Sequence, residues 1–345
     1  MKKTVFLFLI VSLLLLTSCE KEPGRFSAYS FDFFDTATTV VGYADSKEEF
    51  DKVVEEIFAS FEEYHKLFTI YNRYDGLTNL CSINMTDKEV NVDEKIIDLL
   101  TFSKDMYSLT NGRTNVAMGS VLSIWHSHRE TGIRHPEKAT LPSMDKLLSA
   151  AEHTSIDSIV LDKENGTVCR LDSKMTLDVG AVAKGFAVAR VAEELESKGI
   201  SGYLLNVGGN VCTIGTRPDG TKWAVGIENP TGDEDEPYIA YLKLADKSVV
   251  TSGSYQRYYF VNGEKYHHII DPDTLMPGEN YISVSVICDD SGVGDALSTA
   301  LFCMSFDDGA ALVECLEGVE AMWMLPSGEI KYSTGFLNFT EDKAL

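Results

Sequence analysis

Hydrophobic residues recur with helical spacing in several stretches of the chain. The clearest stretch runs from Ser46 to Phe68, where apolar side chains return every three or four positions and would share one face of a helix. Ser46 and Glu49 fit a capping box at its start. Similar patterns predict further helices over 93–109, from Gly180 to about Lys198, and from near Asp295 and near Asp307.

Between these helices lie short runs rich in β-branched and aromatic residues, which are typical of strands. Helical and strand patterns are mixed along the chain without strict alternation. This mixture favours an α+β fold with mixed sheets and packed helices over a doubly wound sheet. The predicted strands cover residues 158–161, 203–207, 223–227, 238–244, 282–287, 321–325 and 329–333.

The first 19 residues form a separate pattern. Two lysines precede an apolar run from Val5 to Leu16, which is too short to span a membrane permanently and fits the hydrophobic region of a secretory signal. Leu16-Thr17-Ser18-Cys19 follows and looks like a bacterial lipobox, in which Cys19 is lipidated. We therefore expect a signal peptide over 1–18 and a lipidated tether over 19–29. The alternative is an ordinary buried N-terminal helix.

The charge of the chain limits its partners. The sequence has 30 basic and 53 acidic residues, for a net charge of −23. This balance argues against nucleic acid as a partner, because such binding depends on neutralising phosphates. It also argues against electrostatic adhesion to anionic lipid, so the lipid on Cys19 would be the membrane link.

Residues 176–188 carry the most informative local pattern. An apolar run reaches Asp178, turns at Gly180, and passes Lys184 and Gly185 into a predicted helix. The amino end of a helix offers unpaired N–H groups and a positive dipole end, and Lys184 adds a full charge. The segment is therefore suited to hold an anion, although Gly/Lys turns of this kind are common.

Asp295 and Thr299 lie four residues apart on a predicted helix, so their oxygens would share one face. A carboxylate and a hydroxyl suit a hard cation such as Mg²⁺, which keeps waters and shares phosphate oxygens. The spacing alone fits a helix cap and a threonine bonded to its own helix better. His268 presents a similar choice, because a histidine beside an apolar pair is more often a core group than a catalyst.

Several motifs follow one another in a fixed order. Residues 176–188 precede Asn206-Val207-Gly208-Gly209-Asn210, Thr251-Ser252-Gly253, His267-His268-Ile269-Ile270-Asp271-Pro272 and Asp295-Ala296-Leu297-Ser298-Thr299. In this order they resemble the ApbE-like FAD:protein FMN transferase family, from about Phe34 to the C-terminal strands. The resemblance implies one domain over 30–340 with an ApbE-like, T-fold-like α+β architecture.

The resemblance also implies a reaction. Members are exported, magnesium-dependent enzymes that transfer FMN from FAD to a Thr or Ser hydroxyl of an acceptor protein and release AMP. We therefore expect FAD as the substrate, Mg²⁺ as the cofactor, and a separate exported or membrane redox protein as the acceptor. The expected location is a bacterial membrane, with the lipid-anchored protein on its extracytoplasmic or periplasmic side. An FAD pyrophosphatase that releases FMN and AMP, and a non-catalytic flavin-binding lipoprotein, remain open as alternatives.

The same resemblance implies the site residues. His268 would assist attack or orient the phosphate, and Asp295 and Thr299 would bind Mg²⁺ with the backbone carbonyl of Ala181. A buried pair of Asp178 with Lys184 would stabilise both charges near a phosphate. The expected flavin-nucleotide contacts are Phe34, Tyr71, Arg113, Thr114, Asn115, Asp178, Lys184 and Ile269.

Three positions depart from the family pattern and suggest a divergent member. Arg113-Thr114-Asn115 stands where Ala-Phe-Asp is common, and Ala189 replaces a frequent Asp. Thr274-Leu275-Met276-Pro277 lacks the glycine of a usual Thr-Gly-x-Pro turn. Because FAD is anionic and the chain is acidic, its site also needs local positive charge or a metal.

Overall fold

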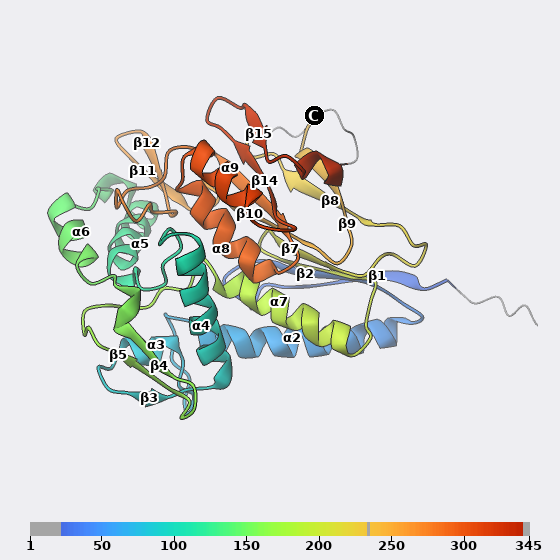
Figure 1. The fold of residues 1–345 in the computed structure, drawn as a ribbon, viewed down its shortest axis with the longest axis horizontal. Helices are drawn as coiled ribbons and strands as arrows, with labels where there is room; N and C mark the ends of the chain where they lie inside the picture. Colours follow the sequence, from blue (N-terminus) through green and yellow to red (C-terminus); the bar gives the residue numbers. More distant parts are fainter. Residues whose placement is uncertain (1–21, 233–234, 341–345) are drawn as a thin grey trace, which may run out of the picture.

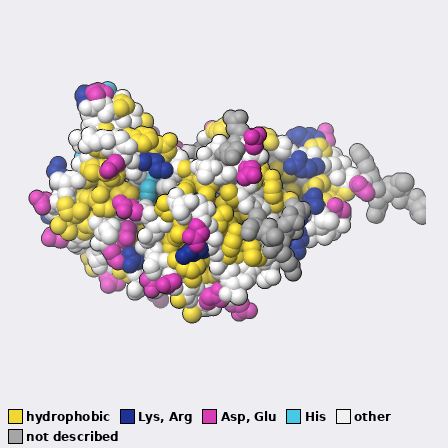
Figure 2. All heavy atoms as spheres, turned by 90° about the horizontal axis from the view of Figure 1, so that it is seen from above, with side chains coloured by type: hydrophobic (Ala, Val, Ile, Leu, Met, Phe, Trp, Pro, Cys, Tyr) yellow, Lys and Arg dark blue, Asp and Glu magenta, His cyan; other side chains and the backbone are white. Residues whose placement is uncertain are grey.

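The computed structural model describes residues 22–232 and 235–340 (Figure 1). The predictions of a signal peptide over 1–18 and of lipidation at Cys19 lie outside the described residues. Within the described residues, no helix is long and apolar enough to cross a membrane. Acidic side chains are spread over the face that Figure 2 shows, in keeping with the net charge of −23.

An eight-stranded sheet runs through the molecule, and every neighbouring pair in it is antiparallel. Helices and antiparallel strands in one chain confirm the α+β class. The strands, in spatial order, are β1 (Gly24–Ser30), β2 (Thr38–Ala44), β6 (Tyr203–Val207), β7 (Asn210–Ile214), β10 (Ser248–Gly253), β13 (Ser283–Cys288), β14 (Glu320–Met324) and β15 (Ile330–Tyr332).

The two faces of this sheet are covered differently. Successive strand side chains point to opposite faces, and Val40 and Val41 of β2 accordingly belong to different apolar clusters. One face packs against four helices, and the other against a hairpin and a short 3₁₀ helix. The helices are α2 (Lys47–Phe68), α7 (Ala183–Ser197), α8 (Ser291–Phe302) and α9 (Phe306–Glu314), and the hairpin is β8 (Trp223–Glu228) with β9 (Tyr238–Leu244).

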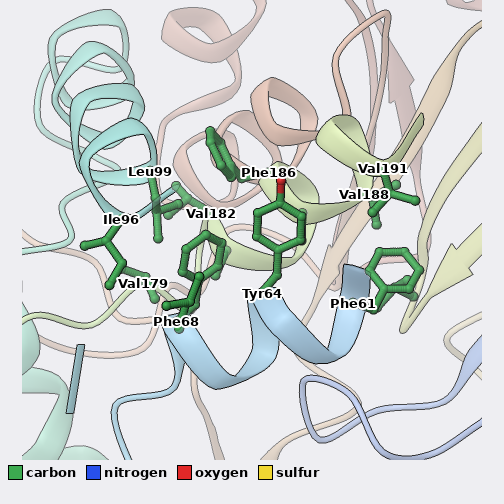
Figure 3. Packing of buried hydrophobic residues seen from close by; sticks show 14 of the residues in the cluster. Phe61, Tyr64, Phe68, Ile96, Leu99, Val179, Val182, Phe186, Val188 and Val191 are labelled. Atoms are coloured by element: carbon green, nitrogen blue, oxygen red, sulfur yellow. The ribbon is translucent and has the colours of Figure 1, made fainter. Parts of the chain in front are cut away.

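The largest apolar cluster joins α2, α7 and α4 (Glu94–Leu109). Figure 3 shows Phe61, Tyr64 and Phe68 of α2 beside Phe186 of α7 and Leu99 of α4. Burial of each such side chain contributes roughly 1.5–3 kcal/mol. This packing fixes the start of α7, on which the predicted anion site depends.

A second lobe carries the remaining elements, at the left of Figure 1. Its apolar cluster includes Val121 and Trp125 of α5, Leu147 of α6, and Tyr259 of β11. A three-stranded sheet lies below this cluster in Figure 1 and contributes Ile159 and Val168 to the largest apolar cluster instead. These elements are α5 (Gly119–Arg134), α6 (Met144–Ala151), β11 (Tyr258–Val261), β12 (Glu264–His267), α3 (Leu80–Asn84), β3 (Val90–Asn91), β4 (Ile159–Asp162) and β5 (Thr167–Arg170).

The structure confirms the start of α2, where the Ser46 side chain accepts a hydrogen bond from the N–H of Glu49 at 3.2 Å. It moves the start of α8, which begins at Ser291 rather than near Asp295. Asp290 caps α8 by accepting hydrogen bonds from two backbone N–H groups. Asp295 is therefore an interior residue of the helix, and the helix-cap interpretation of Asp295 is wrong.

The predicted tether over 19–29 also needs correction. Gly24–Ser30 forms edge strand β1, which pairs with β2 along its whole length. Alternate residues of β1 are half-buried, and Phe26 packs on Phe50 of α2 with ring centroids 5.5 Å apart. Residues 24–29 therefore belong to the folded part and not to a tether.

Candidate active site

A cleft separates the α7–α8 pair from the lobe that carries α5. Its lining comes from segments far apart in the sequence, including the turn before α7, strand β10, helix α8 and the residues after β12. Most of the predicted site residues meet there. Those that line the cleft are Tyr71, Arg113, Thr114, Asn115, Asp178, Ala181, Lys184, His268, Ile269, Asp295 and Thr299.

Phe34 is outside this lining. Its ring packs edge-on against Phe61 and His65, with centroids 6.5 and 5.8 Å away. Its backbone N–H donates to Nδ1 of His65 at 3.1 Å, and its φ is 53°. Thr36, two residues later, lines the cleft instead. Contact of Phe34 with a flavin stays a prediction, and the structure gives the residue a packing role.

Helices α7 and α8 cross closely because Gly185 has no side chain. A Cβ at this position would lie 2.3 Å from the carbonyl oxygen of Ser291 and 2.5 Å from Cβ of Asp295. This close approach lets the N–H of Gly185 donate to Oδ2 of Asp295 at 2.9 Å. The Lys184-Gly185 pair seen in the sequence therefore joins the two helices at the site.

The lysine partner differs from the prediction. Nζ of Lys184 lies 3.1 and 3.3 Å from the two carboxylate oxygens of Asp295, which is 3% exposed. The expected pair of Lys184 with Asp178 is thus wrong, because the crossing of α7 over α8 brings Asp295 nearer. Asp178 accepts a hydrogen bond from the N–H of Gly180 at 2.9 Å, and burial raises the pKa of its carboxyl.

Hydroxyl groups continue the site from Asp295 along α8. Oγ of Ser252, on β10, lies 2.8 Å from Oγ of Ser298 and 3.3 Å from Oγ1 of Thr299. Asp295 and Thr299 both line the cleft, as does Ala181 in the turn before α7. Among the described residues, no group of three or more His, Cys, Asp and Glu side chains could hold a metal. A single carboxylate with hydroxyls and a carbonyl fits Mg²⁺, which keeps waters and shares substrate oxygens.

His268 and His267 are held in different ways. Nε2 of His267 lies 2.7 Å from the carbonyl oxygen of Gly278, and its Nδ1 accepts from the N–H of Ile269 at 3.2 Å. The side chain of His268 lies beside the backbone of Arg257, and its buried Nδ1 has no partner in the described residues. His267 is therefore structural, whereas His268 has one buried ring nitrogen without a hydrogen-bond partner among the described residues.

The electrostatics around His268 favour a neutral ring. Burial is the largest cause, and the nearby charges of Arg257 and Arg129 add to it. Together they lower the pKa of His268 to about 3 from its ordinary value of 6.5. A neutral imidazole with a free nitrogen can accept a hydrogen bond or a proton from a hydroxyl.

The side chains of the 113–115 segment already have partners within the protein. Arg113 pairs with Asp271 at 2.9 Å and also with Asp273. Oγ1 of Thr114 donates to the carbonyl oxygen of Ala296 at 2.7 Å, and Nδ2 of Asn115 donates to that of Thr154 at 2.9 Å. These contacts hold the three side chains in the cleft wall.

Sequence reasoning missed three basic residues that line the cleft. His126 and Arg129 belong to α5, and Arg257 follows β10. Met118, Leu122, Trp125, His126 and Arg129 recur at helical spacing and form the cleft-facing stripe of α5. That periodicity was the available signal, but the stripe mixes apolar and charged residues and so lacks the usual contrast between helix faces.

Comparisons with known proteins agree with this geometry. The model of the ApbE family matches residues 34–323. An FAD:protein FMN transferase of Haemophilus influenzae is 27% identical over 326 residues, which cover 91% of each chain. One of Treponema pallidum is 28% identical over 304 residues, covering 84% of this chain and 82% of its own.

A solved structure supports the fold over the same range. The ApbE protein of Thermotoga maritima is 27% identical and has a TM-score of 0.80, with 92% of this chain and 100% of that chain covered. The family model spans the site motifs from the turn before α7 to α8, and these motifs line one cleft. The chain belongs to the ApbE family.

Proposed function

We propose that this chain is an FAD:protein FMN transferase that moves FMN from FAD to a Thr or Ser hydroxyl of an acceptor protein and releases AMP. The observation that carries this proposal is the convergence of Asp295, Thr299 and His268 on one cleft in a member of the ApbE family. The names of the two relatives described above support the same activity.

The bond changes of the proposed reaction balance without an oxidant or reductant. The acceptor hydroxyl oxygen forms a bond to the phosphorus of the FMN half of FAD, and the anhydride bond to AMP breaks. The hydroxyl proton goes to a base, and AMP carries away the electron pair of the broken bond. The product is FMN held to the acceptor by a phosphodiester.

His268 is the base that the geometry favours. His268 lines the cleft, and its Nδ1 is buried and has no hydrogen-bond partner within the described protein. A neutral imidazole can accept the proton of an approaching hydroxyl, which is worth typically 10²–10⁴-fold in rate.

Asp295, Thr299 and the Ala181 carbonyl are the groups that would hold Mg²⁺ in this proposal. When bound, the ion would neutralise charge on the phosphate oxygens as the anhydride bond breaks. Lys184 occupies the Asp295 carboxylate in the structure, so its ammonium would have to share or leave those oxygens. A lysine so displaced lies in the same cleft as the phosphates and would bind them as a point charge.

We further propose that the protein acts outside the cytoplasm, held to a bacterial membrane by lipid on Cys19. The lipobox-like sequence at residues 16–19 supports this location. An exported or membrane redox protein is then the acceptor class that such an enzyme could reach. Globomycin treatment of expressing cells should leave an uncleaved precursor, and unchanged processing would contradict lipidation.

Intact mass spectrometry tests the activity. The full chain in detergent is mixed with FAD, Mg²⁺ and a candidate acceptor domain. An FMN-sized mass gain on the acceptor that EDTA prevents would support transfer. FMN and AMP formed without an adduct would favour the pyrophosphatase, and FAD bound but intact would favour a flavin-binding lipoprotein.

A further inference from the structure

Four basic side chains of the Lys and Arg type line the cleft, and they differ in what they contact. Lys184 is paired with Asp295, and Arg113 is paired with Asp271. Arg129 and Arg257 have no carboxylate within ion-pairing distance among the described residues. In a chain with a net charge of −23, two such unpaired guanidinium groups in one cleft need an explanation.

The two arginines also act on each other. Burial is the main cause that lowers the pKa of Arg129, and the charge of Arg257 lowers it further. Nη2 of Arg129 lies 2.9 Å from Nδ1 of His126, and the charges of Glu130 and Asp178 do not offset the effect of burial on Arg129. Like charges in a half-buried cleft destabilise the empty protein, and an anion between them would relieve that repulsion.

The position of Arg129 along α5 narrows the choice of anion. The cleft-facing stripe of α5 begins with Met118 and Leu122, passes Trp125, and ends with His126 and Arg129. An apolar surface followed by a guanidinium suits a ligand with a flat ring at one end and phosphate beyond it. Exposed Tyr71, whose ring lies 5.4 Å from that of His126, adds an aromatic surface at the same place.

We propose that Arg129 and Arg257 form an oxyanion-binding wall that holds the diphosphate of the flavin nucleotide. This inference rests on the proposed function. It adds side chains of α5 and of the segment after β10 to the phosphate contacts that Mg²⁺ and Lys184 would make in the same cleft. Planar guanidinium groups match phosphate oxygens with paired N–H donors. The wall also explains how an acidic protein gathers an anionic substrate.

The wall has a consequence for His268. Both guanidinium groups lower the pKa of its imidazole. Phosphate oxygens bound between them would offset that positive charge and raise the proton affinity of the ring. Substrate binding would thereby make His268 a better base at the moment when a hydroxyl arrives.

Flavin titrations of the full chain test the wall. Binding of riboflavin, FMN and FAD is followed by fluorescence in EDTA, for wild type, Arg129→Met and Arg257→Met. Each charged hydrogen bond contributes about 1.5–3 kcal/mol, so each variant should bind FAD about 10- to 100-fold more weakly. Riboflavin has no phosphate, and its affinity should stay within about twofold. Arg134→Met is the matched control, because Arg134 is an exposed residue of α5 whose one ion pair within residues 22–232 and 235–340 is with Glu130.

Each other outcome has a definite meaning. Unchanged FAD affinity in both variants would refute the proposal that these arginines bind the diphosphate. A raised KM for the acceptor protein in those variants would then assign the arginines to acceptor binding. Equal weakening of FAD and riboflavin would also overturn it, because the effect would not depend on phosphate. If wild type bound no flavin, the proposed function would fail. The melting temperature in inorganic pyrophosphate is a separate test of the oxyanion wall. A rise in wild type that Arg129→Met abolishes would support the wall, and no rise in wild type would refute it.

Discussion

The Lys184–Asp295 ion pair should couple the stability of the protein to the proposed Mg²⁺ site. We consider Lys184→Met, Asp295→Asn and the double variant. The side chains of Lys184 and Asp295 are 22% and 5% exposed. Removing one partner of a fully buried pair costs about 3–5 kcal/mol, because the other charge is left without compensation. Solvent reaches Lys184, so we expect a smaller loss of about 1–3 kcal/mol for Asp295→Asn.

The two single variants are not equivalent. Asparagine keeps an oxygen that can accept from the N–H of Gly185, whereas Lys184→Met leaves the Asp295 carboxylate with that single donor. We therefore expect Lys184→Met to cost at least as much as Asp295→Asn. In the double variant both charges are gone, so its loss should be smaller than the sum of the single losses by about 1–2 kcal/mol.

Urea unfolding of all four proteins, followed by tryptophan fluorescence, measures this coupling. Repeating the series in MgCl₂ adds a second readout, because a ligand that binds the folded state raises the free energy of unfolding. Mg²⁺ should stabilise Lys184→Met more than wild type, since the ion no longer competes with an ammonium, and should not stabilise Asp295→Asn. Additivity of the single losses within about 0.5 kcal/mol, or equal stabilisation of all variants by Mg²⁺, would refute the reasoning.

Three further predictions follow from the site. The pKa of His268 is lowered to about 3, so its neutral ring contributes its full stability above about pH 6.5 and this stability is lost as the pH falls toward 3. His268→Gln should therefore flatten the dependence of the unfolding free energy on pH between about 6.5 and 3. An unchanged pH profile would contradict this prediction. Thr299→Ala should lower the rate of flavin transfer about 10-fold or more while Thr299→Ser retains most of it, and equal rates would remove the hydroxyl from the site. Gly185→Ala should lower the unfolding free energy by about 1–3 kcal/mol, although alanine has the better helix propensity, because the alanine Cβ would meet the Ser291 carbonyl. The control Ser197→Ala, on the same helix, should be neutral.

Local signals in the sequence were sufficient for several elements. The capping residue and apolar spacing of α2 lie within one stretch of chain, and the structure places its start at the predicted position. The motifs around Lys184, His268 and Asp295 likewise identified one family and most of one cleft. Such features depend on neighbours a few residues apart, so the order of residues alone encodes them.

The partners of those residues depend on long-range packing. Whether Lys184 meets Asp178 or Asp295 is decided by how closely α7 crosses α8 at Gly185. Arg129 and Arg257 act on each other only because α5 packs against β11, the strand that follows Arg257. Phe34 packs on Phe61 of α2 and so lies outside the cleft lining. The sequence by itself therefore determined the family and the residues that carry the chemistry. The tertiary structure alone decided which charges are paired, because the spacing of residues along the chain does not specify where helices cross.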